Sequence, residues 1–202
     1  IMSTAYVLVE YDGDQVFPIT GELITAAKVF ESVTAVVVGP AGVHEPLVPQ
    51  LAALGADAIV AAVGADTAQR VVLPAADALS MLAAGAPGPI LVGAGVTGNE
   101  IAGRLAARLA SGVLCDVVQV NSDLTALMSI FGDAIEVSTA VGGSSPIYTM
   151  RHGATEVPAK PTPGAGVVST FELPAASEKD VTVTKFVPAV KGDRPDLTNA
   201  KV

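Results

Sequence analysis

Apolar runs that alternate with segments of helical period constrain the fold of this chain more than any other feature. Residues 5–10 are a continuous apolar run of the kind that is buried on both faces, and residues 20–30 follow with helical spacing behind Thr20 as the expected N-cap. The two patterns then recur, with strands predicted at 34–38, 58–62, 90–92 and 113–120, and helices at 45–54, at 66–84 with a break at Pro74, and through 101–109. Such alternation implies right-handed crossovers, so we predict an α/β fold with a doubly wound, mostly parallel sheet.

After residue 120 the rhythm changes, because no segment of helical period separates the next apolar runs. Residues 126–131, 134–141 and 146–150 follow one another across short turns that contain glycine, which is typical of antiparallel hairpins. We therefore predict that an antiparallel β meander of three strands is appended to the parallel sheet.

The last quarter of the chain has a different composition. From Gly153 it becomes rich in proline, threonine and glycine, which predicts an exposed loop before two alternating segments at 167–173 and 181–187. The following residues read as a linker that ends as if a new strand were about to begin. We therefore divide the chain into an α/β domain, residues 1–187, and a linker, residues 188–202, and expect the natural chain to continue.

Residues 93–98 spell GAGVTG, a literal GxGxxG between a predicted strand and a predicted helix. In dinucleotide-binding folds such glycines allow a tight turn and a close approach to pyrophosphate, with an acidic residue about 20 positions later. Asp116 lies near that distance but within a predicted strand, three strand–helix units precede the loop, and Glu100, placed in the first helical turn, would repel phosphate. We therefore interpret the glycines as a packing turn. The alternative is a NAD-dependent dehydrogenase that uses the loop from Gly93 to Gly98.

Charge and composition exclude several classes of protein. The formal net charge is −9, and residues 1–150 carry 14 acidic and 4 basic side chains, whereas nucleic-acid binding needs clustered cations. The lone Cys115 rules out an internal disulfide and favours a reducing compartment. His44 and His152 have no metal-ligand spacing, so no metal is expected. Glycines and prolines break up the uncharged stretch 78–99, so no membrane-spanning helix is predicted either.

Three further side chains are candidates for chemistry. Arg104 and Arg108 lie with Glu100 along one face of a predicted helix and are able to clamp an anion or meet an acidic partner. We favour the plainer interpretation, a solvated face on which Glu100 pairs with Arg104. Cys115 lies in an apolar strand without a histidine nearby in sequence, so it is predicted to be buried filler and not a nucleophile. No catalytic residue is predicted.

Two stretches of the sequence resemble the alpha subunits of the electron transfer flavoprotein family. The run GNEIAGRLAARLASGVLCDVVQV, followed by SIFGDAIEVSTA, is similar to a helix, a strand and a glycine-marked hairpin of that family's N-terminal domain. The tail GDRPDLTNAKV is similar to its interdomain segment at Asp193, Arg194, Pro195, Leu197, Thr198, Ala200, Lys201 and Val202. The resemblance covers essentially the whole chain, and the tail is its most specific part.

The resemblance implies a Rossmann-like N-terminal domain, followed after residues 188–202 by an FAD-binding domain that this sequence lacks. FAD is therefore expected in the full-length heterodimer and not on this segment, which has no position that matches the family's flavin-binding residues. The resemblance also implies a beta subunit as partner, which contacts the predicted meander. The candidate interface residues are Ile130, Phe131, Ile135 and Val137.

The implied function is part of an electron carrier and not of an enzyme. In that family the heterodimer takes electrons from flavin dehydrogenases, such as the acyl-CoA dehydrogenases of fatty acid β-oxidation, and passes them to a membrane quinone oxidoreductase. A carrier of this kind needs no acid–base residues of its own. The resemblance implies a bacterial cytoplasmic protein without direct membrane insertion. Besides the dehydrogenase, a free-standing adenine-nucleotide-binding module is a further alternative.

Overall fold

A single large sheet forms the centre of the molecule. The structure is a computed structural model that describes residues 4–178, 180–187 and 192. Within these residues nine strands form one sheet in the order β11-β5-β4-β1-β6-β10-β7-β8-β9, and two short strands form a separate antiparallel pair. The large sheet is mostly parallel, which confirms the predicted fold class. The predicted linker, residues 188–202, lies outside the described residues except for Gly192.

The elements follow the predicted alternation of strand and helix up to β7. The strands of the large sheet are β1 (Thr4–Leu8), β4 (Ser32–Gly39), β5 (Ala58–Val63), β6 (Ile90–Gly93), β7 (Val113–Val120), β8 (Ala126–Ile130), β9 (Ile135–Thr139), β10 (Ile147–Met150) and β11 (Val167–Glu172), and the short pair is β2 (Tyr11–Asp12) and β3 (Gln15–Val16). The helices are α1 (Pro18–Ala27), α2 (Val48–Leu54), α3 (Leu73–Gly85) and α4 (Val96–Leu109), with the 3₁₀ turn η1 (Thr67–Gln69) before α3.

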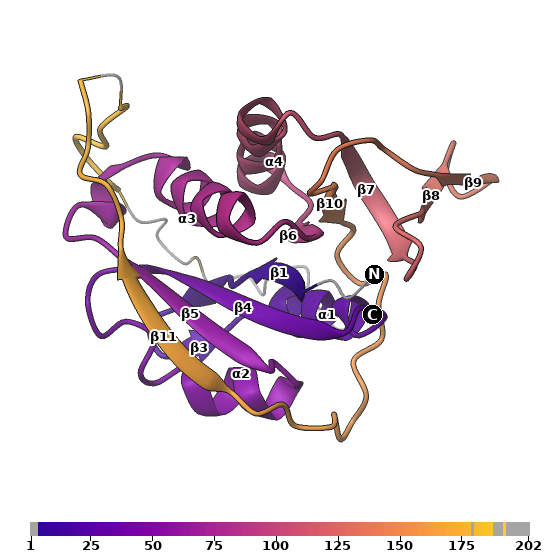
Figure 1. Ribbon diagram of the computed structural model, residues 1–202, viewed down its shortest axis with the longest axis horizontal. Coiled ribbons are helices and arrows are strands. Elements are labelled where there is room, and N and C mark those ends of the chain that lie inside the picture. The colour runs from indigo at the N-terminus through magenta and orange to yellow at the C-terminus, as the bar shows by residue number, and fades with distance from the viewer. Residues whose placement is uncertain (1–3, 179, 188–191, 193–202) are drawn as a thin grey trace.

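Helices cover both faces of the parallel part of the sheet. Figure 1 shows α3 and α4 on one side and α1 and α2 on the other. Along β1, Val7 packs in the cluster that contains residues of α1 and α2, whereas Tyr6 and Leu8 pack in the cluster that contains residues of α3 and α4. A continuous apolar strand is therefore needed here, because side chains on both faces are buried.

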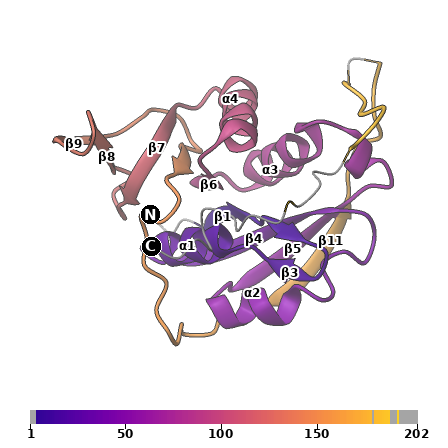
Figure 2. The same cartoon turned by 180° about the vertical axis from the view of Figure 1, so that it is seen from behind.

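Strand β10 corrects the predicted meander. Residues 146–150 are predicted to be its third antiparallel strand, but β10 pairs in parallel with β6 on one side and with β7 on the other. All four of its residues are buried, because β6 and β7 flank the strand and helices cover both of its faces: Tyr148 and Met150 pack in the cluster that contains α1, and Ile147 packs in the cluster that contains α4. The antiparallel meander therefore consists of β7, β8 and β9. Figures 1 and 2 both show β8 and β9 projecting beyond the helices at the end of the sheet opposite β11.

The structure corrects one predicted helix boundary and agrees with two others. Thr20 does not cap α1, which begins at Pro18; its hydroxyl accepts a hydrogen bond from the Glu10 backbone N–H (2.8 Å) and donates one to the Glu10 carbonyl (3.1 Å). The break at Pro74 is confirmed, because Pro74 lies in the first turn of α3 after η1. Gly55 ends α2 with a φ of 110°, a conformation that suits glycine.

The segment after β10 returns across the molecule to the other edge of the sheet. The loop predicted after Gly153 is confirmed, since residues 151–166 contain no helix or strand. β11 then pairs in parallel with β5 at the edge. The second alternating segment, predicted at 181–187, forms no strand and makes one isolated bridge between Thr182 and Arg70.

Candidate functional site

The glycine loop lies where ligands bind in many α/β folds. β1 has β4 on one side and β6 on the other, so the connections that follow β1 and β6 diverge and leave a cleft outside the carboxyl ends of the strands. The loop between β6 and α4 borders this cleft together with Glu10, which follows β1. Position alone therefore makes this loop a candidate binding site.

The glycines themselves support the packing interpretation at two of three positions. A Cβ at Gly98 would overlap the carbonyl oxygen of Gly93, and a Cβ at Gly93 would overlap the carboxylate of Glu10. Gly95 has a φ of 149°, but no atom lies within 4 Å of the place a Cβ would take. Gly98 is thus required for the close contact between β6 and α4, and Gly93 leaves room for the side chains of Glu10 and of Ile19 in α1, whether or not a ligand binds.

Two adjoining cavities make up the cleft, which carries little positive charge. They measure about 420 and 350 Å³ and share Leu8, Glu10, Thr97 and Ile101 in their linings. Burial raises the pKa of Glu10, and nearby His152 partly offsets that shift. Among the described residues, no hydrogen bond reaches the Glu10 carboxylate. A half-buried acidic group at the centre of the cleft favours donor groups over phosphate.

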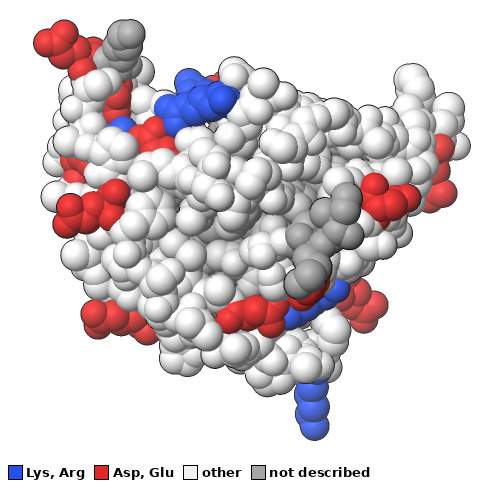
Figure 3. Space-filling model, in the orientation of Figure 1, with Lys and Arg blue, Asp and Glu red and all other residues white. Residues whose placement is uncertain are grey.

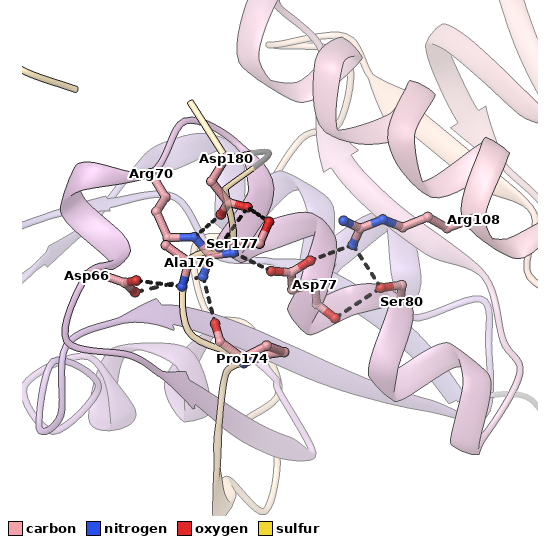
Figure 4. A network of polar contacts seen from close by, with 9 residues as sticks. All are labelled: Asp66, Arg70, Asp77, Ser80, Arg108, Pro174, Ala176, Ser177 and Asp180. Carbon is pink, nitrogen blue, oxygen red and sulfur yellow. Dashed lines mark hydrogen bonds and ion pairs between the residues drawn. The ribbon is translucent and has the colours of Figure 1, made fainter. Parts of the chain in front are cut away.

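Arg70 lines the larger cavity, but its guanidinium is occupied by other groups (Figure 4). Its Nε donates to Asp180 Oδ2 at 2.5 Å, Nη2 to Asp77 Oδ2 at 2.8 Å, and Nη1 to the Pro174 carbonyl at 2.9 Å. The side chain is 4% exposed. Burial lowers its pKa, but the hydrogen bonds and charges of Asp180 and Asp77 outweigh that effect and raise it. Arg70 is therefore a structural cation and is not free to take an anionic ligand.

The Arg70 cluster ties the segment after β11 to the body of the domain. We call residues 174–178 and 180–183 the strap. Besides the ion pair with Asp180, the strap accepts a backbone hydrogen bond from Val71 at its Val181 carbonyl (3.3 Å), and its Val183 N–H donates to the Gln69 carbonyl (2.7 Å). Asp77 also binds Arg108 of α4 at 2.6 Å, so one carboxylate joins α3, α4 and, through Arg70, the strap (Figure 4).

The predicted dinucleotide features do not come together. Asp116 lies in β7, which β10 separates from β6, and its carboxylate binds Arg151. One argument against phosphate is also wrong: α4 begins at Val96, so Glu100 lies in its second turn and pairs with Arg104. The favoured interpretation of this helix face is confirmed, because Arg104 pairs with Glu100 and Arg108 pairs with Asp77.

Cys115 corrects another prediction, because it is exposed and not buried. The register between β7 and β10 shifts next to it, and Asp116 has a φ of 58°. Such a bulge redirects side chains, and both Cys115 and Asp116 are turned outward. Among the described residues no group of three or more His, Cys, Asp and Glu side chains is placed to hold a metal ion.

The meander presents an apolar face that none of the described helices covers. Cross-strand pairing puts Met128 opposite Val137 and Ile130 opposite Ile135, so these four side chains share one side of the hairpin, which we call the meander face. The same side of β7 and β8 continues into the core through Val117, which lies opposite Met128. Ile135 is 48% exposed and Val137 37% exposed. Phe131, in the turn between β8 and β9, is 79% exposed.

The four predicted interface residues are therefore neighbours at one end of the molecule. Figure 3 shows that much of the face seen in Figure 1 is uncharged, with acidic groups mainly along its edge. The apolar side chains at the hairpin are unusual because they form a continuous strip in place of scattered single residues. Sequence reasoning missed Arg70 and Arg151, because their contacts with Asp180 and Asp116 join segments 110 and 35 residues apart that share no local motif.

No helix among the described residues is both long and apolar enough to cross a membrane. The electron transfer flavoprotein domain family matches residues 5–176. The chain is 41% identical over 202 residues to the electron transfer flavoprotein subunit alpha of Mycobacterium leprae, which covers all of this chain and 63% of the relative. It is 43% identical over 178 residues to that of Mycobacterium tuberculosis H37Rv, which covers 88% of this chain and 55% of the relative.

A third relative is the electron transfer flavoprotein subunit alpha of Syntrophomonas wolfei. It is 32% identical over 217 residues, which cover all of this chain and 64% of the relative. The chain thus spans less than two thirds of the length of the curated relatives it matches.

Proposed function

This chain belongs to the electron transfer flavoprotein family, and we propose that it is the part of an alpha subunit that docks onto the beta subunit. One observation carries the proposal. The meander face is an exposed apolar strip that continues directly from the buried core of the sheet. An apolar surface of this kind is costly in water and is typical of a protein–protein contact.

The complete subunit pair is proposed to accept electrons from flavin dehydrogenases, such as acyl-CoA dehydrogenases, and to deliver them to a membrane quinone oxidoreductase. In this proposal the domain is a scaffold in the bacterial cytoplasm, and FAD is held by sequence beyond this chain. The cleft supports that division, because the guanidinium of Arg70 in its lining is already bound by carboxylates. A pyrophosphate would therefore meet Glu10 without an unpaired guanidinium or ammonium among the described lining residues to balance it.

The variant Ile135→Asp tests the docking face. A carboxylate in the middle of an apolar contact loses its hydration without gaining a partner. We expect the affinity for the beta subunit of the same organism to fall roughly 30-fold or more, equivalent to about 2 kcal/mol. Calorimetric titration of the purified subunits measures the effect.

Val168→Asp is the matched control. Val168 lies in the edge strand at the opposite end of the sheet and is 43% exposed, close to the 48% of Ile135. This variant adds the same charge to a similar position and should bind the beta subunit like the natural sequence. Equal binding by Ile135→Asp and the natural sequence, with both proteins folded, would refute the assigned face.

The proposal that this domain does not hold FAD has a separate test. The 202-residue chain, purified without its partner, should show no flavin absorbance in the visible range and no retained FAD after gel filtration. One equivalent of FAD on the isolated chain would contradict the scaffold role. Mixing the chain with the beta subunit repeats the measurement on the complex.

A further inference from the structure

The hairpin of β8 and β9 needs support from the rest of the molecule. It projects beyond the helices, and all residues of β9 before Thr139 are exposed. A hairpin of two strands is marginally stable in water, even with well-paired backbones. The hairpin joins the rest of the sheet through β7, and the register between β7 and β8 is irregular between Val117 and Gln119. Backbone pairing alone therefore leaves the direction of the hairpin weakly fixed.

Arg151, the residue directly after β10, contacts three parts of the meander. Its Nε and Nη2 donate to Asp116 Oδ2 of β7 at 3.0 and 2.7 Å. Nη1 donates to Asp133 Oδ1 in the β8–β9 turn at 2.9 Å, and Nη2 also donates to the Ser129 carbonyl of β8 at 2.7 Å. One guanidinium thus joins the buried strand β10 to β7, to β8 and to the turn between β8 and β9.

Both carboxylates that Arg151 binds belong to residues whose backbone has a positive φ. Asp116, at the bulge of β7, has a φ of 58°. In the turn, Phe131, Gly132 and Asp133 have φ values of 54°, 64° and 63°. Residues other than glycine adopt this conformation at a cost in free energy and keep it where the surroundings fix it. The carboxylates of Asp116 and Asp133 are both bound by Arg151, which supplies that restraint.

A second hydrogen bond closes the cluster at the turn. Ser129 Oγ donates to Asp133 Oδ1 at 2.6 Å. This bond and the Arg151 guanidinium lower the pKa of Asp133, so its carboxylate stays ionised at neutral pH. The cluster is therefore charged and complete under the conditions in which a partner would bind.

Arg151 lies on the opposite side of the hairpin from the meander face. Ser129 pairs with Glu136, and side chains of this pair point away from those of Ile130 and Ile135, because the faces of a strand alternate. The guanidinium thus leaves the apolar side free. Its effect on a partner bound there has to pass through the position of the hairpin.

We propose that Arg151 is a positioning residue for the docking face: it fixes the hairpin against β10 and β7, so that the beta subunit meets a preformed surface. This inference rests on the proposed function. A preformed surface binds more tightly because less conformational freedom is lost on association. Arg151 is therefore expected to change the affinity without touching the partner.

The experiment compares Arg151→Met with Arg104→Met. Both arginines are partly exposed and pair with carboxylates, but Arg104 lies on α4 and binds Glu100. In the free chain, Arg151→Met should speed hydrogen exchange of the β8 and β9 amides about tenfold, with exchange in β1, β4 and β6 unchanged. Its affinity for the beta subunit should fall by about tenfold, mainly through faster dissociation. Arg104→Met should change neither quantity.

Arg151→Lys tests the role of the planar guanidinium. Lysine keeps the charge but cannot make the same set of directed hydrogen bonds. The hairpin exchange rate and the affinity of Arg151→Lys should therefore lie between those of the natural sequence and those of Arg151→Met. A structural role without positioning would speed exchange and leave the affinity unchanged. That outcome would overturn the inference, as would unchanged exchange in the hairpin.

Two further outcomes separate this inference from the proposed function. If Ile135→Asp leaves the affinity unchanged, the docking face is wrong, whatever the exchange data on Arg151 give. If Arg151 instead binds an acidic group of the partner directly, Arg151→Met should lose affinity without faster exchange in the free chain. In that case the lost affinity should also shrink as the salt concentration rises.

Discussion

Two arginines, at opposite ends of the sheet, bind several chain segments each in very different surroundings. The Arg70 side chain is 4% exposed, and its partners Asp77 and Asp180 are 13% and 6% exposed. The Arg151 side chain is 32% exposed, and its partner Asp133 is 72% exposed. The hydrogen-bonding chemistry is the same in both clusters. The difference in hydration assigns them different roles: the first maintains the structure and the second orients a surface.

The physical reason lies in what remains after either arginine is removed. Without Arg70, Asp77 still binds Arg108 and Asp180 still accepts hydrogen bonds from Ser177, but both buried carboxylates lose the cation that they share, which is unfavourable. Without Arg151, water replaces the guanidinium at exposed carboxylates with little change in free energy. The loss of unfolding free energy should therefore differ clearly between variants of the two clusters, although the two arginines make similar hydrogen bonds.

The largest effect is expected from Arg70→Met. Methionine fills a similar volume but removes the cation that binds the buried carboxylates of Asp77 and Asp180. Arg108 stays bound to Asp77 and Ser177 to Asp180, so the free energy of unfolding should fall by about 3 kcal/mol, the low end for a broken buried ion pair. Urea denaturation measures it, with Arg104→Met as control because that arginine is on the surface. The comparison fails if Arg70→Met unfolds at the same urea concentration as the natural sequence.

A smaller effect is expected on how the stability of the domain depends on pH. Hydrogen bonding from Ser177 lowers the pKa of Asp180, and Arg70 adds to the shift despite burial. A carboxyl group with a lowered pKa in the folded state stabilises it above the unfolded pKa of about 4, and that contribution disappears as the pH falls further. Asp180→Asn should therefore flatten the loss of stability below about pH 4. Thermal unfolding across that pH range gives the slope, which would be identical in both proteins if Asp180 were unpaired.

Tyr148→Phe measures the link between the centre of the sheet and the meander. Tyr148 is fully buried, and its hydroxyl donates to the Leu124 carbonyl at 2.7 Å. Losing this bond should cost about 1 kcal/mol. Burial also raises the pKa of Tyr148 to about 12, so the natural sequence should lose stability between about pH 10 and 12 and the phenylalanine variant should not. Denaturation at about pH 9 and about pH 11 distinguishes the two expectations.

The smallest effect on stability is expected from Arg151→Met, which should lower the free energy of unfolding by only a small fraction of the loss in Arg70→Met, because the Arg151 cluster is hydrated. The same variant is expected to move the hairpin, so stability and affinity should respond to it differently. A loss as large as that of Arg70→Met would show that the exposed cluster also maintains the fold. Urea denaturation of both variants in the same buffer decides this.

The parallel part of the fold can be predicted because its signals are local. Each strand there is an apolar run buried on both faces, each helix has a regular apolar period, and Gly55 and Pro74 mark helix boundaries. The family is predicted from the helix and strand around Cys115 and from the tail, and this prediction is confirmed. Patterns that depend on neighbouring residues can be recognised in the sequence itself.

The failures concern contacts between distant segments. A short turn before β10 favours a place in the meander, although Ile147, Tyr148 and Met150 do not alternate with polar residues as β9 does. That absence of alternation is the available signal for a central strand. The prediction that Cys115 is buried fails because a bulge has no sequence signature of its own.

The candidate site can be predicted only in part. The meander face follows from apolar alternation, but which residues share a side depends on the register of β8 and β9, and that register is fixed by the turn. Arg70 and Asp180 are 110 residues apart, and Arg151 and Asp116 are 35 apart. No periodicity connects such pairs, so their roles are visible only in the folded chain.

The place of β10 also bears on how the chain is made. Residues 147–150 are synthesised after the whole meander, yet they fill the gap between β6 and β7. Until they emerge from the ribosome, the preceding strand–helix units have no partner on that side, and the meander has nothing to attach to. We therefore expect the two halves of the sheet to join only after residue 150 has been made, before β11 adds to the opposite edge, as is usual for contacts that close over long stretches of sequence. A chain interrupted before that point would expose two unpaired strand edges and be at risk of aggregation.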